Sequence, residues 1–145
     1  MNILHGLPRV ALVAALQLLM SAREVGDYAI PLSPRGHEQA LATGRLLGTE
    51  FVRSAVIYSS PYRRTRDTTD GILAGAGVSR TDVRVFEDPR LREVEHGYED
   101  PEAQEELREM HGWFYYRFRG GESPADCFDR TSSFLESMMR LVERR

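Results

Sequence analysis

Hydrophobic and polar residues follow one another along this chain in blocks that predict helices separated by short strands. Residues 55–58 form a short apolar, β-prone run, and residues 83–86 form a second. Each run has the length of a buried strand. Apolar residues at helical spacing follow Ser33 and Pro34 up to about Phe51. This pattern predicts an amphipathic helix with a serine N-cap and a first-turn proline.

The stretch after the first apolar run joins a strand to a charged helix start. Ser59, Ser60 and Pro61 supply a cap and a proline suited to a first turn, so a helix is predicted to begin at about Pro61. Its first turns carry three arginines, Arg63, Arg64 and Arg66. Forked guanidinium donors beside the N–H groups of a helix start suit an oxyanion. A solvated charged face would explain the same spacing.

Two further helices are predicted in the second half of the chain. A capping sequence at residues 100–102 begins a helix rich in glutamate that runs towards Met110. A capping-box pattern at residues 123–126 precedes the final helix. The apolar side chains of that helix recur at helical spacing, at Phe128, Leu135, Met138, Met139 and Val142. Before these helices, glycines between residues 71 and 77 are expected to loosen the chain.

The N-terminal stretch leaves several interpretations open. Residues 10–22 are almost wholly apolar but fall short of the roughly 18 residues that indicate a membrane span. With Arg9 in front they could be a secretory signal, although the positive region is thin and residues 20–22 are a poor cleavage site. The alternative is a buried strand from about Arg9 to Val13, followed by a helix; propensity alone would make the whole stretch helical. No membrane anchor is expected.

Composition narrows the classes of protein. The length suits a single domain spanning residues 1–145. A net charge of −3, with 41% hydrophobic and 28% charged residues, indicates neither a nucleic-acid binder nor a disordered tail. The partner is therefore expected to be small. A lone cysteine, Cys127, excludes an intrachain disulfide, offers no metal constellation and fits a reducing, cytoplasmic compartment.

An aromatic cluster at residues 113–118 lies beside Arg117 and Arg119. Such a cluster could be a stacking surface for a nucleic-acid base. More often it is the edge of a core or the wall of a pocket, and we favour that interpretation.

Two motifs of this chain resemble motifs of the histidine phosphatase superfamily, which includes the cofactor-dependent phosphoglycerate mutases. Residues 60–68 resemble its Ser-Pro-Leu-x-Arg-Ala-x-x-Thr motif, with Arg64 in the place of the phosphate-binding arginine and Tyr62 in that of the leucine. Residues 91–97 resemble Leu-Arg-Glu-x-x-x-Gly, whose glutamate, here Glu93, donates a proton to the leaving group. Nearby arginines would keep this carboxylate ionised, so donation requires partial burial or a bound phosphate. A surface carboxylate paired with those arginines is the alternative.

The resemblance covers most of the chain, from Pro31 onward. Residues 32–40 resemble Leu-Thr-x-x-Gly-x-x-Gln-Ala, and residues 91–141 are similar to a phosphoglycerate-mutase-like branch of plants, fungi and bacteria. It implies an α/β fold, a mostly parallel sheet with helices on both faces and a site at the C-terminal ends of the strands. Ser60 would belong to the phosphate site. Glu122, in the family's Gly-Glu-Ser, would lie near the substrate end of the pocket, unless it only starts the last helix.

The family reaction is phosphoryl transfer through a phosphohistidine, with no metal or cofactor, and a second histidine helps to neutralise the phosphoryl oxygens. The nucleophile stands in an Arg-His-Gly motif after the first strand, where this chain has Ala14, Ala15 and Leu16. His5 precedes the predicted strand, so it is not expected to replace that nucleophile. The second histidine would follow the last helix in a further strand, before which the chain stops, at Arg145. An incomplete, C-terminally truncated domain is therefore expected.

Three functional hypotheses follow. The first is a phosphatase acting on a small phosphorylated substrate but catalytically impaired, because the surrounding pocket does not replace a missing nucleophile. The second is a non-catalytic phosphate-binding or interaction protein on the same fold. The third is a fragment that folds poorly around an open sheet edge. A reading-frame shift over the first thirty or so residues would explain the missing motif.

Overall fold

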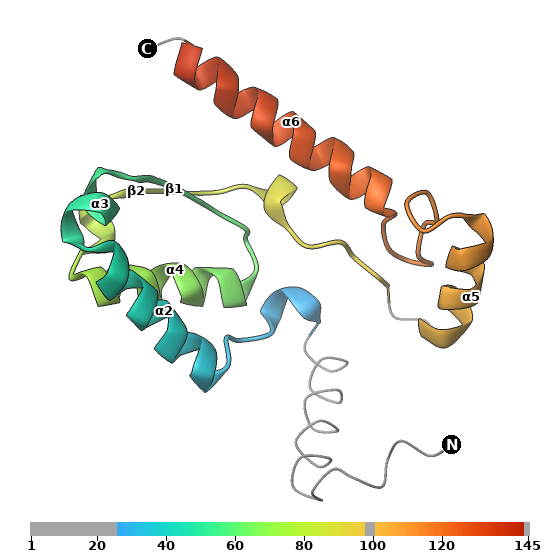
Figure 1. Ribbon diagram of the computed structural model, residues 1–145, viewed down its shortest axis with the longest axis horizontal. Helices are drawn as coiled ribbons and strands as arrows, with labels where there is room; N and C mark the ends of the chain where they lie inside the picture. Colours follow the sequence, from blue (N-terminus) through green and yellow to red (C-terminus); the bar gives the residue numbers. More distant parts are fainter. Residues whose placement is uncertain (1–25, 98–100, 144–145) are drawn as a thin grey trace, which may run out of the picture.

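The computed structural model describes residues 26–97 and 101–143 (Figure 1). In chain order its elements are the 3-10 turn η2 (Asp27–Ala29), helices α2 (Pro34–Leu47) and α3 (Thr49–Ser54), strand β1 (Val56–Ser59), helix α4 (Arg63–Ala76), the 3-10 turn η3 (Arg80–Asp82), strand β2 (Arg84–Glu87), the 3-10 turn η4 (Pro89–Leu91), and helices α5 (Pro101–His111) and α6 (Pro124–Glu143). The two strands are confirmed, each one residue later than predicted. The strand predicted at residues 9–13 lies outside the described residues.

The sheet of the described residues is a parallel pair, β1 and β2, with helices on both of its faces. On one face, Ile57 packs against a core formed by residues of α3 and α4 and by Val78, which follows α4. The core residues are Val52, Leu73, Ala76 and Val78. On the other face Tyr58 meets Phe86 of β2 and Phe134 of α6, each with ring centroids 5.4 Å apart. The predicted α/β class is therefore confirmed, with α6 across the sheet from α4 (Figure 1).

Helices α2 and α4 pack so closely that main chain approaches main chain. A Cβ atom on Gly44 would lie 2.1 Å from the carbonyl oxygen of Ile72. A Cβ atom on Gly75 would lie 2.1 Å from the carbonyl oxygen of Leu41. Only glycine leaves room for this approach, so the two helices are held in one register.

The helix predicted up to about Phe51 is two helices. Helix α2 ends at Leu47, and Gly48 follows with a φ of 79°, a left-handed backbone that favours glycine. The chain then starts again at Thr49 as the short helix α3. The prediction of one continuous helix was wrong because Gly48 turns the chain at this point.

Helix α4 differs from its prediction at both ends. It begins at Arg63 instead of Pro61, because Tyr62 is its N-cap and keeps an extended backbone, with ψ at 141°. The stretch 71–77 was expected to be loose, but it is helical as far as Ala76. Gly77 ends the helix with a φ of 66°. That prediction was wrong because the glycines inside this stretch serve the contact with α2.

The capping box predicted at the start of α6 is present. The Asp126 N–H donates to the Ser123 hydroxyl oxygen at 3.2 Å, and the Asp126 carboxylate accepts from the Ser123 N–H at 2.8 Å. The Ser123 hydroxyl also donates to this carboxylate, at 2.7 Å, and this bond is the main cause that lowers the pKa of Asp126. No helix among the described residues has the length and apolar character needed to cross a membrane.

We expect Gly44→Ala to destabilise the protein. The added methyl group would push α2 off the α4 main chain at a cost of about 1–3 kcal/mol, against a gain in helix propensity of about 1 kcal/mol. Urea unfolding measures the difference. Ala42→Ser, on an exposed position of the same helix, is the control that adds one heavy atom outside the contact. A Gly44→Ala protein as stable as the wild type would show that separating the helices costs no more than the roughly 1 kcal/mol gained in helix propensity.

Ser123→Ala is expected to lower the stability of the protein at neutral pH. It is also expected to make the free energy of unfolding less dependent on pH in the acidic range. The folded-state pKa of Asp126 is lowered, so its stabilising contribution is complete above the ordinary pKa of 3.8 and is lost as pH falls through the folded value. Without the serine hydroxyl the pKa of Asp126 returns towards 3.8. The stability that the protein loses on acidification therefore becomes smaller. Urea unfolding at pH 7 and at pH 3 measures both effects, with Ser132→Ala inside the same helix as control. An unchanged pH dependence in Ser123→Ala would contradict the assignment.

Candidate functional site

Three segments far apart in the sequence meet beyond the carboxyl ends of β1 and β2. Arg64, near the start of α4, donates from Nη1 to the carbonyl and to the carboxylate of Asp27 in η2, at 3.0 Å each. Its Nη2 donates to Oε2 of Glu93, in the stretch after η4, at 2.6 Å. The residues predicted as phosphate ligand and proton donor are therefore direct neighbours.

The guanidinium of Arg64 is held from several sides. Its Cζ lies 4.8 Å from the centroid of the Tyr62 ring, close enough for a cation–π contact. Burial disfavours its charged form, but the hydrogen bonds to Glu93 and Asp27 outweigh burial and raise the pKa of Arg64. Burial, then the charges of Asp27 and Glu95, raise the pKa of Tyr62. The site therefore contains a permanent positive charge beside a neutral phenol.

The other two arginines of this helix start do not join Arg64. Arg63 lies 3.9 Å from Asp67, one turn further along the helix. Arg66 donates to Glu87 of β2 at 2.6 Å. Of the three arginines expected to form an anion pocket, Arg64 is therefore the one that lies between Asp27 and Glu93, and the pocket itself stays a prediction.

Ser60 lies buried in the turn that leads from β1 to α4. Its hydroxyl oxygen accepts a long hydrogen bond, 3.4 Å, from the N–H of Tyr62. Its carbonyl accepts from the Thr65 hydroxyl at 2.7 Å. These bonds shape the turn that presents Arg64, while the role of Ser60 as a phosphate ligand stays a prediction.

A pocket of about 170 Å³ opens beside Arg64 and is lined by Asp27 and residues 93–97. The Glu93 side chain is 63% exposed, so it is accessible to a molecule entering from solvent. Proton donation by Glu93 was expected to require either partial burial or a bound phosphate. Partial burial is not met, so a bound phosphate is the remaining condition. His96 also lines this pocket, with its ring 4.7 Å from that of Phe118.

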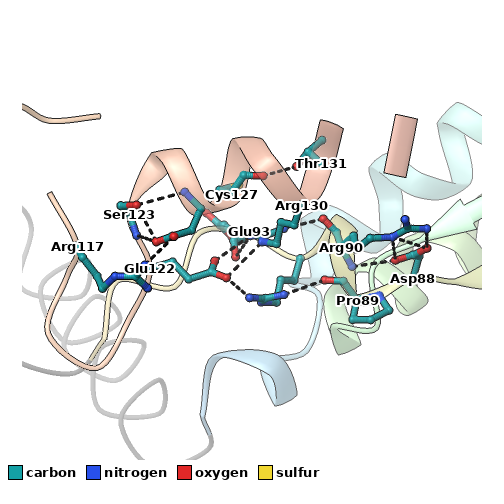
Figure 2. Close-up of polar contacts among 12 residues, drawn as sticks. Asp88, Pro89, Arg90, Glu93, Arg117, Glu122, Ser123, Cys127, Arg130 and Thr131 are labelled. Atoms are coloured by element: carbon teal, nitrogen blue, oxygen red, sulfur yellow. Dashed lines mark hydrogen bonds and ion pairs between the residues drawn. The ribbon is translucent and has the colours of Figure 1, made fainter. Parts of the chain in front are cut away.

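Glu122 is brought to the same region but faces inward. Its residue is 8% exposed, and its carboxylate accepts hydrogen bonds from Arg92 and from Arg130, the latter with Nη2 at 3.0 Å (Figure 2). The carboxylate is therefore engaged by two guanidinium groups from different elements. Its predicted contact with substrate stays a prediction.

Two residues of this region were missed from the sequence. Arg130 lies three residues after Cys127 and four before Phe134, so an arginine within the apolar stripe of the last helix was the available signal. Asp27 gives no comparable signal, because its partner is 37 residues away and no spacing rule connects them.

Several predicted features cannot be placed in this site. Residues 14–16, where the nucleophile motif would stand, and His5 lie outside the described residues. In the described part of the chain, no group of three or more His, Cys, Asp or Glu side chains could hold a metal ion. His37 is exposed on α2, and His111 is exposed at the end of α5.

Comparison with known proteins identifies the family of this chain. The family model described as the histidine phosphatase superfamily (branch 1) matches residues 20–145. The chain is 41% identical over 132 residues to the phosphoglycerate mutase-like protein AT74H of Arabidopsis thaliana, and 47% identical over 129 residues to AT74 of the same plant. Each match covers 81% of this chain but only 46% and 40% of the two relatives. The chain thus spans less than half the length of these relatives.

A solved structure shows the same similarity in three dimensions. It is a mycobacterial glucosyl-3-phosphoglycerate phosphatase in complex with inorganic phosphate, with 26% sequence identity and a TM-score of 0.52. The match covers 76% of this chain and 54% of the phosphatase. On the family model, the relatives and the fold together, the chain belongs to the histidine phosphatase superfamily.

Proposed function

We propose that this chain carries the phosphate-ester site of a histidine phosphatase. Arg64 binds the phosphoryl group of a small phosphorylated substrate, and Glu93 donates a proton to the leaving group. The observation that carries the proposal is the 2.6 Å contact between these two side chains. Cleavage of a phosphate ester needs a positive partner for the phosphoryl oxygens and a proton for the leaving oxygen. This pair would supply both at the mouth of one pocket.

Binding would exchange one anion for another at Arg64. The guanidinium now donates to two carboxylates, and a phosphoryl group suits the same planar fork of donors. The charge of the bound ester would then favour the protonated form of the neighbouring Glu93. Ser60, in the turn beneath, would be a further ligand if its hydroxyl turned towards the ester.

Weak turnover is part of the proposal. Residues 14–16 read Ala-Ala-Leu where the family has Arg-His-Gly, and an absent nucleophile is not replaced by binding groups. The second candidate is therefore a non-catalytic protein of the same fold that binds a phosphorylated ligand. The contact between Arg64 and Glu93 supports this candidate as well. It shows a guanidinium group that already binds a carboxylate, and binding a phosphorylated ligand requires no more than this group. In both cases we propose a single domain working in the cytoplasm.

Millimolar inorganic phosphate is expected to raise the melting temperature of the wild-type protein, because a ligand that binds only the folded state stabilises it. Arg64→Ala should abolish this shift, while Arg63→Ala should retain it. Both positions lie in the first turn of α4, but Arg63 forms its ion pair among the described residues with Asp67 and does not contact Asp27 or Glu93. A phosphate-dependent shift that survives in Arg64→Ala would refute the proposed ligand.

Hydrolysis of p-nitrophenyl phosphate separates the two candidates. Slow turnover that disappears in Arg64→Ala would support an enzyme. A folded chain that binds phosphate without turnover would support the non-catalytic protein. Turnover that also disappears in His5→Ala would overturn our dismissal of that histidine.

Asp27→Asn is expected to tighten phosphate binding by roughly twofold to fivefold. The substitution removes a carboxylate that competes for Nη1 of Arg64, and a pair of this kind contributes up to about 1 kcal/mol. Titration with phosphate measures the dissociation constant. Asp70→Asn, which removes the exposed partner of Arg80, is the matched control. Weaker binding in Asp27→Asn would show that Asp27 orients the guanidinium instead of competing for it.

A further inference from the structure

Arg130 of α6 binds the main chain on which Glu93 is carried. Its Nη1 donates to the carbonyl of Arg90 at 2.6 Å, and its Nη2 donates to the carbonyl of Glu93 at 3.0 Å (Figure 2). The Arg130 side chain is only 11% exposed. The stretch 92–97 is neither helix nor strand, so hydrogen bonds from outside the stretch have to fix its path.

Glu122 holds Arg130 in this orientation. Nε and Nη2 of Arg130 face the two carboxylate oxygens of Glu122, at 3.3 Å and 3.0 Å. The main chain of Glu122 also reaches the same stretch, because its N–H donates to the carbonyl of Glu95 at 2.7 Å. Arg92, within the stretch, donates to the Glu122 carboxylate as well. A buried carboxylate with two guanidinium partners is compensated in charge and is costly to disturb.

We infer that Arg130, oriented by Glu122, is a positioning residue that fixes the main chain at Glu93 and so places the Glu93 carboxylate against Arg64. The Glu93 side chain is largely exposed, so burial does little to hold it in place. Its position depends on where its main chain runs, and Arg130 is the side chain that holds this main chain at Glu93 itself. The placement stands by itself; its value for proton donation rests on the proposed function.

The geometry requires an arginine. One planar group reaches two carbonyl oxygens and one carboxylate at the same time, from a single side chain of α6. A lysine would keep the charge but has a single nitrogen, which cannot span these three acceptors. Arg130→Lys therefore separates the charge of this residue from its geometry.

The test is the energetic coupling between Arg64 and Glu93, from double-mutant cycles of Arg64→Met and Glu93→Gln in urea unfolding. In the wild-type background we expect the pair to change the unfolding equilibrium constant by roughly threefold. In the Arg130→Lys background the coupling should vanish. Arg140→Lys is the matched control, because Arg140 lies on the same helix and pairs with the exposed Glu136. The coupling should survive there.

Coupling that persists in Arg130→Lys, or that is absent from the wild type, would overturn the inference. A general loss of stability in Arg130→Lys cancels within each cycle and does not imitate the expected result. Glu122→Gln is the second variant, and it should weaken the coupling, because the amide keeps the shape but loses the charge that orients Arg130. Unchanged coupling in a folded Glu122→Gln protein would also overturn the inference.

Failure of the proposed function would look different. The cycles are run without phosphate, so the placement of Glu93 is tested even if the protein binds no phosphate. Loss of coupling in Arg130→Lys, together with no phosphate-dependent stabilisation of the wild type, would retain the positioning role and reject the phosphate site.

Discussion

The close approach of α2 and α4 is the constraint on which the rest of the structure depends. A glycine on each helix lies against the main chain of the other, and main chains in such contact cannot slide past one another. This register brings the segment before α2 to the start of α4, where the Leu32 N–H donates to the Asp67 carboxylate at 3.2 Å. Asp27 therefore reaches Arg64, and the charged site follows from a contact that contains no charge.

The site and its support have complementary electrostatics. At one end a guanidinium, Arg64, lies between two carboxylates; at the other a carboxylate, Glu122, lies between two guanidinium groups. Glu93 joins the two ends, since its side chain belongs to the first and its main chain to the second. The first end borders an open pocket and the second is buried. A dissolved anion can therefore compete for partners at the first end, while the second keeps its shape.

The parts of the fold that depend on residues close together in the sequence could be predicted from the sequence. The capping box before α6 and the two strands could be found because their signals lie within a few residues. The stretch 71–77 was misjudged because its glycines serve a contact between helices, which no local rule reveals. The motif resemblance brought out Arg64 and Glu93, and the structure places them side by side. Asp27 could not be found in this way, because its contact depends on the packing of α2.

Helix α6 is attached more by hydrogen bonds than by apolar burial. Among its described side chains Phe134 alone is buried, whereas four large apolar ones are more than half exposed. These are Phe128, Leu135, Met139 and Leu141. Detachment of α6 would expose little new apolar surface, so its heat-capacity change and denaturant dependence would both be small. Because Arg130 is part of this helix, the main chain at Glu93 would lose its hydrogen bonds to Arg130 whenever α6 detaches. Such local opening would take place while the sheet is still folded.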